Sequence, residues 1–211
     1  MKPSHGYPIP AQSVRVEQVI KRSRFVIDVG HAVTRAAAIA FIEQVRTDQA
    51  DARHHCWAYV AGHPDHSVER ASSDDGEPQG TAGKPMLNVL QHKGIGEIVV
   101  VVSRYFGGIK LGAGGLVRAY SSSVQQGVDA LMLMQRIPLT TVTIRLSFAQ
   151  ESQVRHLLEQ VQATIQHCDY GSEVTLIIET SVGSERKLKQ AILNSTQGAA
   201  RVTFPVDDAA R

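Results

Sequence analysis

The chain contains an acidic triplet, Asp74, Asp75 and Glu77, whose carboxylates could share a cation or act in acid–base chemistry. Carboxylate oxygens are ligands that Mg²⁺ prefers. The same residues could instead form an acidic turn, in which Asp74 or Asp75 caps nearby backbone and Gly76 makes the bend. The turn is the favoured interpretation, because three acids in a loop do not by themselves define a site.

A second candidate group is His54-His55-Cys56, which lies in a predicted strand. Neighbours on a strand point to opposite faces, so His54 and Cys56 share a side and His55 does not. His54 and Cys56 could form a nucleophile pair, with His54 as acid or base, or two ligands of a metal site that His63, His66 or the acidic triplet would have to complete. A buried thiol beside a hydrogen-bonded histidine is the favoured alternative.

Two glycine-rich loops, Gly80–Lys84 and Gly107–Gly115, each run into a predicted helix. Backbone N–H groups at a helix start suit a bound anion, although such loops also serve as simple strand-to-helix turns. The loop residues predicted to hold an anion are Gly80, Thr81, Gly83, Lys84, Gly107, Gly108, Lys110, Gly112, Gly114 and Gly115.

Neither loop matches a known nucleotide fingerprint. A phosphate-binding P-loop requires glycine where Pro78 stands and serine or threonine where Pro85 stands. The dinucleotide fingerprint requires a third glycine where Val117 stands, and no acidic partner follows about 20 residues later. No cofactor and no metal are therefore predicted.

Cationic and aromatic residues alternate along one face of the same predicted strand, as they do in proteins that bind single-stranded nucleic acid. A half-exposed sheet face of any protein would show similar residues. The residues of this predicted face are Arg53, His55, Trp57 and Tyr59, extended by Arg104 and Tyr105 on a neighbouring strand and by Lys84, Lys110 and Arg118 near the loops.

The elements that would position these groups follow from hydrophobic periodicity. Ile98–Val102 is an unbroken β-branched run, typical of a strand that is buried on both faces. The segment 62–83 shows no hydrophobic period and is predicted to be a long loop. The other predicted elements before Pro138 are strands 14–21, 23–29 and 53–61 and helices 35–48, 85–94 and 115–134.

Pro138 marks a predicted boundary between domains 1–137 and 138–211. Beyond it, the predicted elements are strand 141–148, helix 151–161, strands 164–170 and 173–180, helix 185–195 and strand 201–205. The order βαββαβ is that of a ferredoxin-like sandwich, and the whole chain is predicted to be of the α+β class.

Composition predicts a cytoplasmic protein with a hydrophobic core and reduced cysteines. The net charge is +2, and residues 1–137 carry 15 basic and 12 acidic residues, so an anionic partner would meet this part of the chain. Cys56 and Cys168 lie too far apart in sequence to suggest a disulfide framework. The first ten residues lack the apolar region of a signal peptide, and no run is long enough to span a membrane.

Three stretches resemble the IMPACT family, and most closely its bacterial YigZ-type members. They are the strand segment 54–59, the acidic and glycine segment 73–85, and the segment 104–116, which reads RYFGGIKLGAGGL. The resemblance implies a βαβ-rich first domain like one in a small-subunit ribosomal protein and in domain IV of elongation factor G. It implies a second domain similar to domain V of that factor. The eukaryotic relatives regulate an initiation-factor kinase through an additional N-terminal domain, so that partner is not carried over.

Two functions are compatible with these residues. The first is a translation-associated or nucleic-acid-binding regulator without chemistry of its own, which meets the phosphates of RNA or the ribosome through the glycine loops and the basic and aromatic face. The alternative is an enzyme acting on a phosphorylated small molecule, with the acidic triplet as metal ligands or base and His54 as acid or base. A protein-interaction module has only the fold class to support it.

Overall fold

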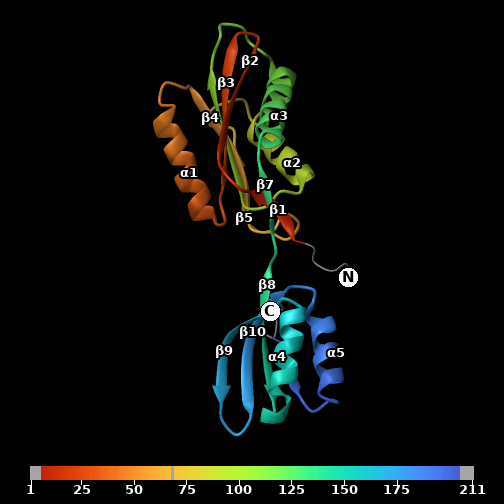
Figure 1. Ribbon diagram of the computed structural model, residues 1–211. Helices are drawn as coiled ribbons and strands as arrows, with labels where there is room; N and C mark the ends of the chain where they lie inside the picture. Colours follow the sequence, from red (N-terminus) through yellow and green to blue (C-terminus); the bar gives the residue numbers. More distant parts are fainter. Residues whose placement is uncertain (1–5, 68, 205–211) are drawn as a thin grey trace. The chain divides into compact units, whose positions relative to one another are not determined.

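The computed structural model describes residues 6–67 and 69–204, which divide into two compact units (Figure 1). The N-terminal unit comprises residues 7–136, and the C-terminal unit comprises Gly6 and the described residues from Ile137 onward. Both units combine helices with antiparallel sheets, so the predicted α+β class is confirmed. No helix in the described part of the chain is long and apolar enough to cross a lipid bilayer.

A five-stranded antiparallel sheet forms the centre of the N-terminal unit. Its strands, in spatial order, are β2 (Val14–Ile20), β3 (Ser23–His31), β6 (Ile98–Tyr105), β4 (His54–Ala61) and β5 (Glu69–Ser73). The predicted buried strand is β6, which pairs with β3 on one side and β4 on the other. Its run Ile98–Val102 is fully buried because helices cover both faces of the sheet.

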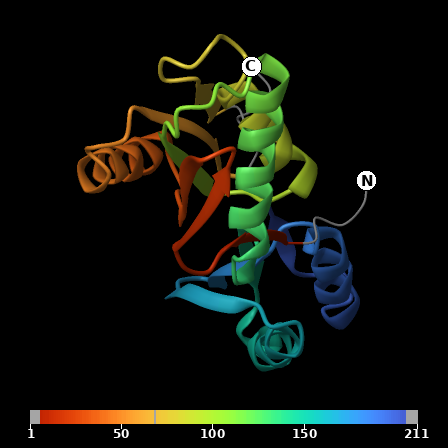
Figure 2. The same ribbon diagram turned by 90° about the horizontal axis from the view of Figure 1, so that it is seen from above.

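Helix α1 (Arg35–Asp48) covers one face of this sheet, and helices α2 (Gly83–Lys93) and α3 (Ala113–Asp129) cover the other (Figures 1 and 2). The helical period of α1 places Ile42 and Val45 against Tyr59 and Val99. A larger core lies beneath α2 and α3, and it includes Phe25, Cys56, Met86, Leu90, Tyr120 and Val124. The two glycine-rich loops therefore lead into helices on the same face of the sheet.

Two predictions for this unit were wrong at the level of single elements. The segment 62–83 contains β5, whose polar residues pair along β4 and carry no hydrophobic period. The helix predicted to continue to Met134 ends at Asp129, and Leu133–Arg136 forms β7. Strand β7 pairs with β1 (Tyr7–Pro10), a contact across more than 100 residues that local periodicity does not encode.

The C-terminal unit contains β8 (Leu139–Leu146), a short 3₁₀ turn (Phe148–Gln150), α4 (Glu151–Gln160), β9 (Thr164–Tyr170), β10 (Val174–Ser181), α5 (Glu185–Ser195) and β11 (Arg201–Thr203). The element order is βαββαβ, and the spatial strand order is β11-β8-β10-β9. Alternate residues of β8 and β10 pack against Val154, Leu158, Leu188 and Ile192 on the helices. The predicted end of the last strand, Pro205, lies outside the described residues.

Candidate anion-binding site

The first glycine loop is occupied by a carboxylate of the protein itself. Asp74 accepts hydrogen bonds from the amides of Gly80, Ala82 and Gly83 at 2.8, 2.9 and 2.8 Å. The Thr81 amide donates to a backbone carbonyl, that of Pro78. The prediction that Gly80, Thr81 and Gly83 hold an external anion is therefore wrong, because Asp74 already caps the start of α2.

Asp74 is thus a structural cap, and its titration should affect folding. Partial burial tends to raise the pKa of Asp74, but the three backbone hydrogen bonds outweigh burial and hold the pKa below its ordinary value. Gly83 fits the same arrangement, since a Cβ at this position would lie 2.7 Å from the backbone of Ser73. The loop is built for close packing against β5.

We expect Asp74→Ala to lower the free energy of unfolding by about 1 to 2 kcal/mol, the cost of losing a helix cap. Because the folded-state pKa is depressed, the contribution of Asp74 is complete above the ordinary carboxyl pKa and is lost as the pH falls through the depressed value. Urea unfolding of wild type and variant at a series of pH values measures how the contribution of Asp74 to the free energy of unfolding changes with pH. A difference between wild type and Asp74→Asn that did not shrink at acid pH would contradict the assignment.

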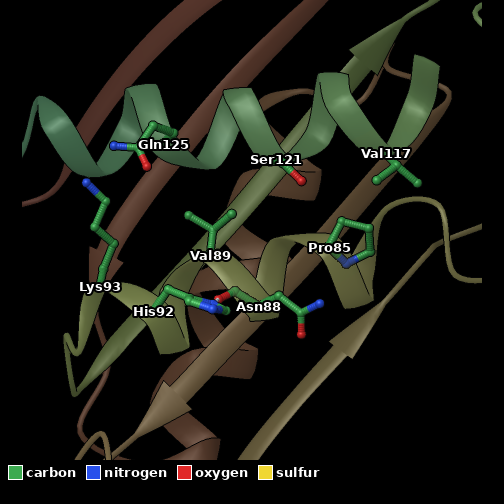
Figure 3. A pocket seen from close by; sticks show the side chains of 8 residues that line it. All are labelled: Pro85, Asn88, Val89, His92, Lys93, Val117, Ser121 and Gln125. Atoms are coloured by element: carbon green, nitrogen blue, oxygen red, sulfur yellow. Dashed lines mark hydrogen bonds between the residues drawn. The ribbon is translucent and has the colours of Figure 1, made fainter. Parts of the chain in front are cut away.

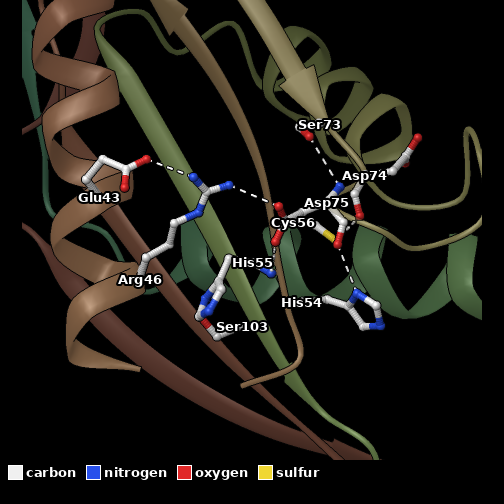
Figure 4. Close-up of polar contacts among 9 residues, drawn as sticks. All are labelled: Glu43, Arg46, His54, His55, Cys56, Ser73, Asp74, Asp75 and Ser103. Atoms are coloured by element: carbon white, nitrogen blue, oxygen red, sulfur yellow. Dashed lines mark hydrogen bonds and ion pairs between the residues drawn. The ribbon is translucent and has the colours of Figure 1, made fainter. Parts of the chain in front are cut away.

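The other two acids of the triplet also have internal partners, and Figure 4 shows those of Asp75. Asp75 accepts from the His55 amide at 2.7 Å and pairs with Arg46 at 3.0 Å. Glu77 is buried and accepts from Arg104 at 2.6 Å and from Tyr120 at 2.8 Å. In residues 6–67 and 69–204, no three His, Cys, Asp or Glu side chains are grouped so as to hold a metal ion. The triplet does not form the metal or acid–base site of the alternative hypothesis.

The pair His54 and Cys56 has the structural role that the simpler interpretation gives it. Cys56 is buried, and its Sγ donates to the carbonyl of Asp74. Burial raises the pKa of Cys56 well above its ordinary value, which disfavours the thiolate that a nucleophile requires. His54 Nδ1 lies 2.9 Å from the carbonyl of Asp75, so this nitrogen carries the proton that is donated to the carbonyl.

The predicted basic and aromatic face is not an open platform. Helix α1 covers it, so Tyr59 is only 3% exposed and His55 9%. Trp57 is half-buried and stacks on Tyr59 with 5.8 Å between ring centroids. Burial lowers the pKa of His55, which disfavours its charged form. The alternation along β4 predicts a solvent-exposed face. In the structure the apolar side of α1 packs on that face and buries it.

The prediction that Arg104 and Tyr105 extend this face as one surface is wrong, because the two side chains lie on opposite faces of the sheet. Arg104 is buried against Glu77 beneath α3. The Tyr105 hydroxyl donates to Gln49, and the guanidinium of Arg24 lies 4.1 Å from the centroid of the Tyr105 ring. Among residues 53, 55, 57, 59, 104 and 105 of the predicted face, only Arg53 is exposed.

The second glycine loop, in contrast, leaves the start of a helix open. No side chain caps α3, and within the described part of the chain the amides of Ala113, Gly114 and Gly115 donate to no acceptor. Gly107 has a structural role, because a Cβ there would clash with the carbonyl of Arg22. Gly108, Gly112 and Gly114 are exposed. The N-terminal amides of a 17-residue helix are therefore available to a negative group.

A cavity of about 410 Å³ lies beside this helix start. Arg53 and Lys110 contribute exposed cations to its wall, and neither has a salt-bridge partner among the described residues. Arg104 also lines it, and within residues 6–67 and 69–204 the buried Nε of Arg104 has no hydrogen-bond acceptor. The complete lining is Arg53, His54, Gly76, Glu77, Pro78, Arg104, Phe106, Lys110, Leu111, Gly112, Ala113 and Leu116.

The remaining predicted cations lie outside this cavity. Lys84 is exposed in the first turn of α2. Arg118 is exposed on α3 and, with Lys21, lines a smaller cavity of about 240 Å³. A third cavity, of about 420 Å³, lies between α2 and α3 (Figure 3). The only lysine or arginine in its wall, Lys93, already pairs with Asp129, so this cavity is a poor anion site.

Sequence reasoning missed the apolar part of the site. Phe106, Leu111, Ala113 and Leu116 line the cavity but were not predicted as site residues. Phe106 carried the clearest signal, since an aromatic residue directly preceding a glycine-rich loop is well placed to meet a ligand. Leu111 and Leu116 were indistinguishable from ordinary core residues in sequence.

Comparison with known proteins identifies the family. Residues 21–128 match the Impact N-terminal domain, and residues 144–199 match a domain of unknown function, DUF1949. The chain is 42% identical over 194 residues to the IMPACT family member YigZ of Escherichia coli (strain K12), covering 92% of this chain and 95% of that protein. It is 36% identical over 170 residues to the IMPACT family member YvyE of Bacillus subtilis (strain 168), covering 81% and 77% of the two chains.

A solved structure agrees with this assignment. The crystal structure of a hypothetical protein matches with a TM-score of 0.69 and 40% sequence identity, covering 97% of this chain and 98% of that one. The resemblance seen in segments 54–59, 73–85 and 104–116 thus extends to the fold. The chain belongs to the IMPACT family.

Proposed function

We propose that the N-terminal unit binds the phosphates of RNA, or of another single-stranded nucleic acid, at the start of α3, without a reaction of its own. One observation carries the proposal. The cavity combines a helix N-terminus without a cap with two exposed cations that have no salt-bridge partner among the described residues. Such a combination favours a negative ligand through both the backbone dipoles and the side-chain charges.

The charges nearby support this proposal. Two carboxylates of the acidic triplet are paired with cations of the protein, Asp75 with Arg46 and Glu77 with Arg104, which reduces their repulsion of a bound phosphate. Lys84 in the first turn of α2 and Arg118 in the second turn of α3 add exposed positive charge. Phosphate contacts of this kind provide affinity and orientation without sequence specificity.

A role in translation rests on the family resemblance, through the likeness of its domains to ribosomal and elongation-factor domains. An enzymatic role is not favoured, because the acidic triplet and Cys56 are engaged in structural contacts. The proposal is therefore a binding protein that acts where single-stranded RNA is exposed.

Binding of a short single-stranded RNA, measured by fluorescence anisotropy over a series of salt concentrations, tests this function. We expect association at low salt and a linear fall of log K with log salt. The double variant Arg53→Ala/Lys110→Ala should bind about tenfold more weakly, and its salt slope should be smaller by about 1.4, twice the value of ~0.7 for one phosphate contact on a single strand.

A matched control removes two charges elsewhere. Arg186 and Lys187 are exposed on α5 in the C-terminal unit, and Arg186→Ala/Lys187→Ala should leave both the affinity and the slope nearly unchanged. Equal weakening by the two double variants would indicate nonspecific attraction to net charge. Absence of binding at low salt would refute the proposed function.

A further inference from the structure

We infer that the cavity beside α3 holds one nucleoside monophosphate unit, with its phosphate at the helix start and its base against Phe106. This inference rests on the proposed function and specifies its ligand. The volume of about 410 Å³ lies within the range of about 300 to 1,000 Å³ that is typical of small-molecule pockets. A cavity of this volume can hold a single nucleotide.

One part of the cavity lining is polar and cationic. Lys110, Gly112 and Ala113 belong to the loop and first residue of α3, and Arg53 adds a second cation. The amides of Ala113, Gly114 and Gly115 donate to no acceptor in the described part of the chain. Ala113 is the one of these three residues that lines the cavity, and its free amide with the two cations suits a terminal phosphate, which has three free oxygens and nearly two negative charges at neutral pH.

A buried donor at the same cavity points independently to a ligand. Arg104 is only 7% exposed, and its Nη1 is bound to Glu77. Its Nε has no acceptor among residues 6–67 and 69–204, although it is buried. Buried donors without an acceptor are unfavourable and rare in proteins. The Arg104 guanidinium lines the cavity, so an anion bound there would add a second negative partner beside Glu77.

The apolar part of the lining suits a base. Phe106 is 51% exposed, and Pro78, Leu111 and Leu116 lie in the same wall. The guanidinium carbon of Arg104 lies 5.7 Å from the centroid of the Phe106 ring. Bases stack readily on exposed aromatic rings whatever their identity. Because such stacking does not depend on which base is bound, we expect little base specificity.

The nucleotide could come from two sources, a free mononucleotide or the end of an RNA chain. The experiment uses the full chain and measures the binding of adenosine monophosphate and adenosine by calorimetry. It also compares one RNA sequence carrying a 5′-phosphate, a 3′-phosphate or no terminal phosphate by anisotropy. We expect adenosine monophosphate to bind at least about tenfold tighter than adenosine, because only the former carries the anion.

Phe106→Ala should weaken the binding of adenosine monophosphate by on the order of tenfold, which is the effect of losing one base–aromatic stack. Ile109→Ala is the matched control, since Ile109 is an exposed residue of the same loop that does not line the cavity. A free-nucleotide site would bind adenosine monophosphate without distinguishing the RNA ends. A chain-end site would prefer one phosphorylated end by at least about tenfold over the unphosphorylated RNA.

The outcomes separate this inference from the proposed function. RNA that binds equally with and without terminal phosphate, together with undetectable binding of adenosine monophosphate, would overturn the nucleotide site and leave the RNA-binding function intact. Adenosine monophosphate that binds and depends on Phe106, with no RNA binding, would support the site and overturn the RNA-binding function. Equal effects of Phe106→Ala and Ile109→Ala would overturn the placement of the base.

Discussion

Replacing Glu77 by alanine is expected to lower the free energy of unfolding of the N-terminal unit by about 3 to 5 kcal/mol, the cost of removing one partner from a buried ion pair. The Glu77 and Arg104 side chains are only 4% and 8% exposed. Without Glu77, the guanidinium of Arg104 stays buried and has no counter-charge. The Tyr120 hydroxyl also loses its acceptor. Burial raises the pKa of Tyr120, so this hydroxyl stays protonated and needs that acceptor.

Urea unfolding followed by tryptophan fluorescence measures this change, because Trp57 is the single tryptophan of the chain and lies in the N-terminal unit. Glu43→Ala is the matched control, since Glu43 forms an exposed pair with Arg46 on α1, and such pairs contribute about 0 to 1 kcal/mol. Glu77→Gln, which keeps an acceptor for Tyr120, should fall between the two. Similar losses for Glu77→Ala and Glu43→Ala would show that the buried pair contributes little.

A carboxylate introduced at the start of α3 should have opposite effects on stability and on RNA affinity. Ala113 is exposed, is the first residue of α3 and lines the cavity. In Ala113→Glu, a negative charge near the helix N-terminus should stabilise the fold by about 0.3 to 1 kcal/mol. The same charge would meet the incoming phosphate, and like charges brought together cost several kcal/mol. We therefore expect RNA affinity to fall on the order of a hundredfold, or about 2.7 kcal/mol.

Ala113→Gln is the control for size and polarity, since it keeps the length of glutamate without its charge. It should bind RNA within about threefold of wild type, a difference of roughly 0.6 kcal/mol. Thermal unfolding checks that neither variant is destabilised. An Ala113→Glu variant that kept wild-type RNA affinity would place the phosphate somewhere other than the start of α3.

The elements with strong periodicity could be predicted from sequence. The predicted ranges 35–48 and 185–195 coincide with α1 and α5 as observed. The β-branched run Ile98–Val102 correctly indicated a strand buried on both faces. Strands β5 and β7 escaped prediction, because their residues are mostly polar or exposed and their stability comes from pairing with distant strands.

The candidate site was predictable only in part, for a related reason. The glycines of Gly107–Gly115 indicated an open helix start, and two of the predicted site residues, Arg53 and Lys110, line the same cavity. The same logic failed at Gly80–Gly83, because nothing local indicated that the Asp74 carboxylate would turn back onto those amides. It failed for His55 and Tyr59 because the position of α1 over β4 is a tertiary contact.

In the proposed mode of binding, the amides at the start of α3, and not those at the start of α2, contact the phosphate. Amide chemical shifts of the ¹⁵N-labelled full chain, titrated with a short single-stranded RNA, test it most directly. The structure predicts large shifts at Ala113, Gly114 and Gly115, and none at Gly80 and Gly83, whose amides Asp74 already holds. Unchanged signals at 113–115, or equal shifts in both loops, would contradict it.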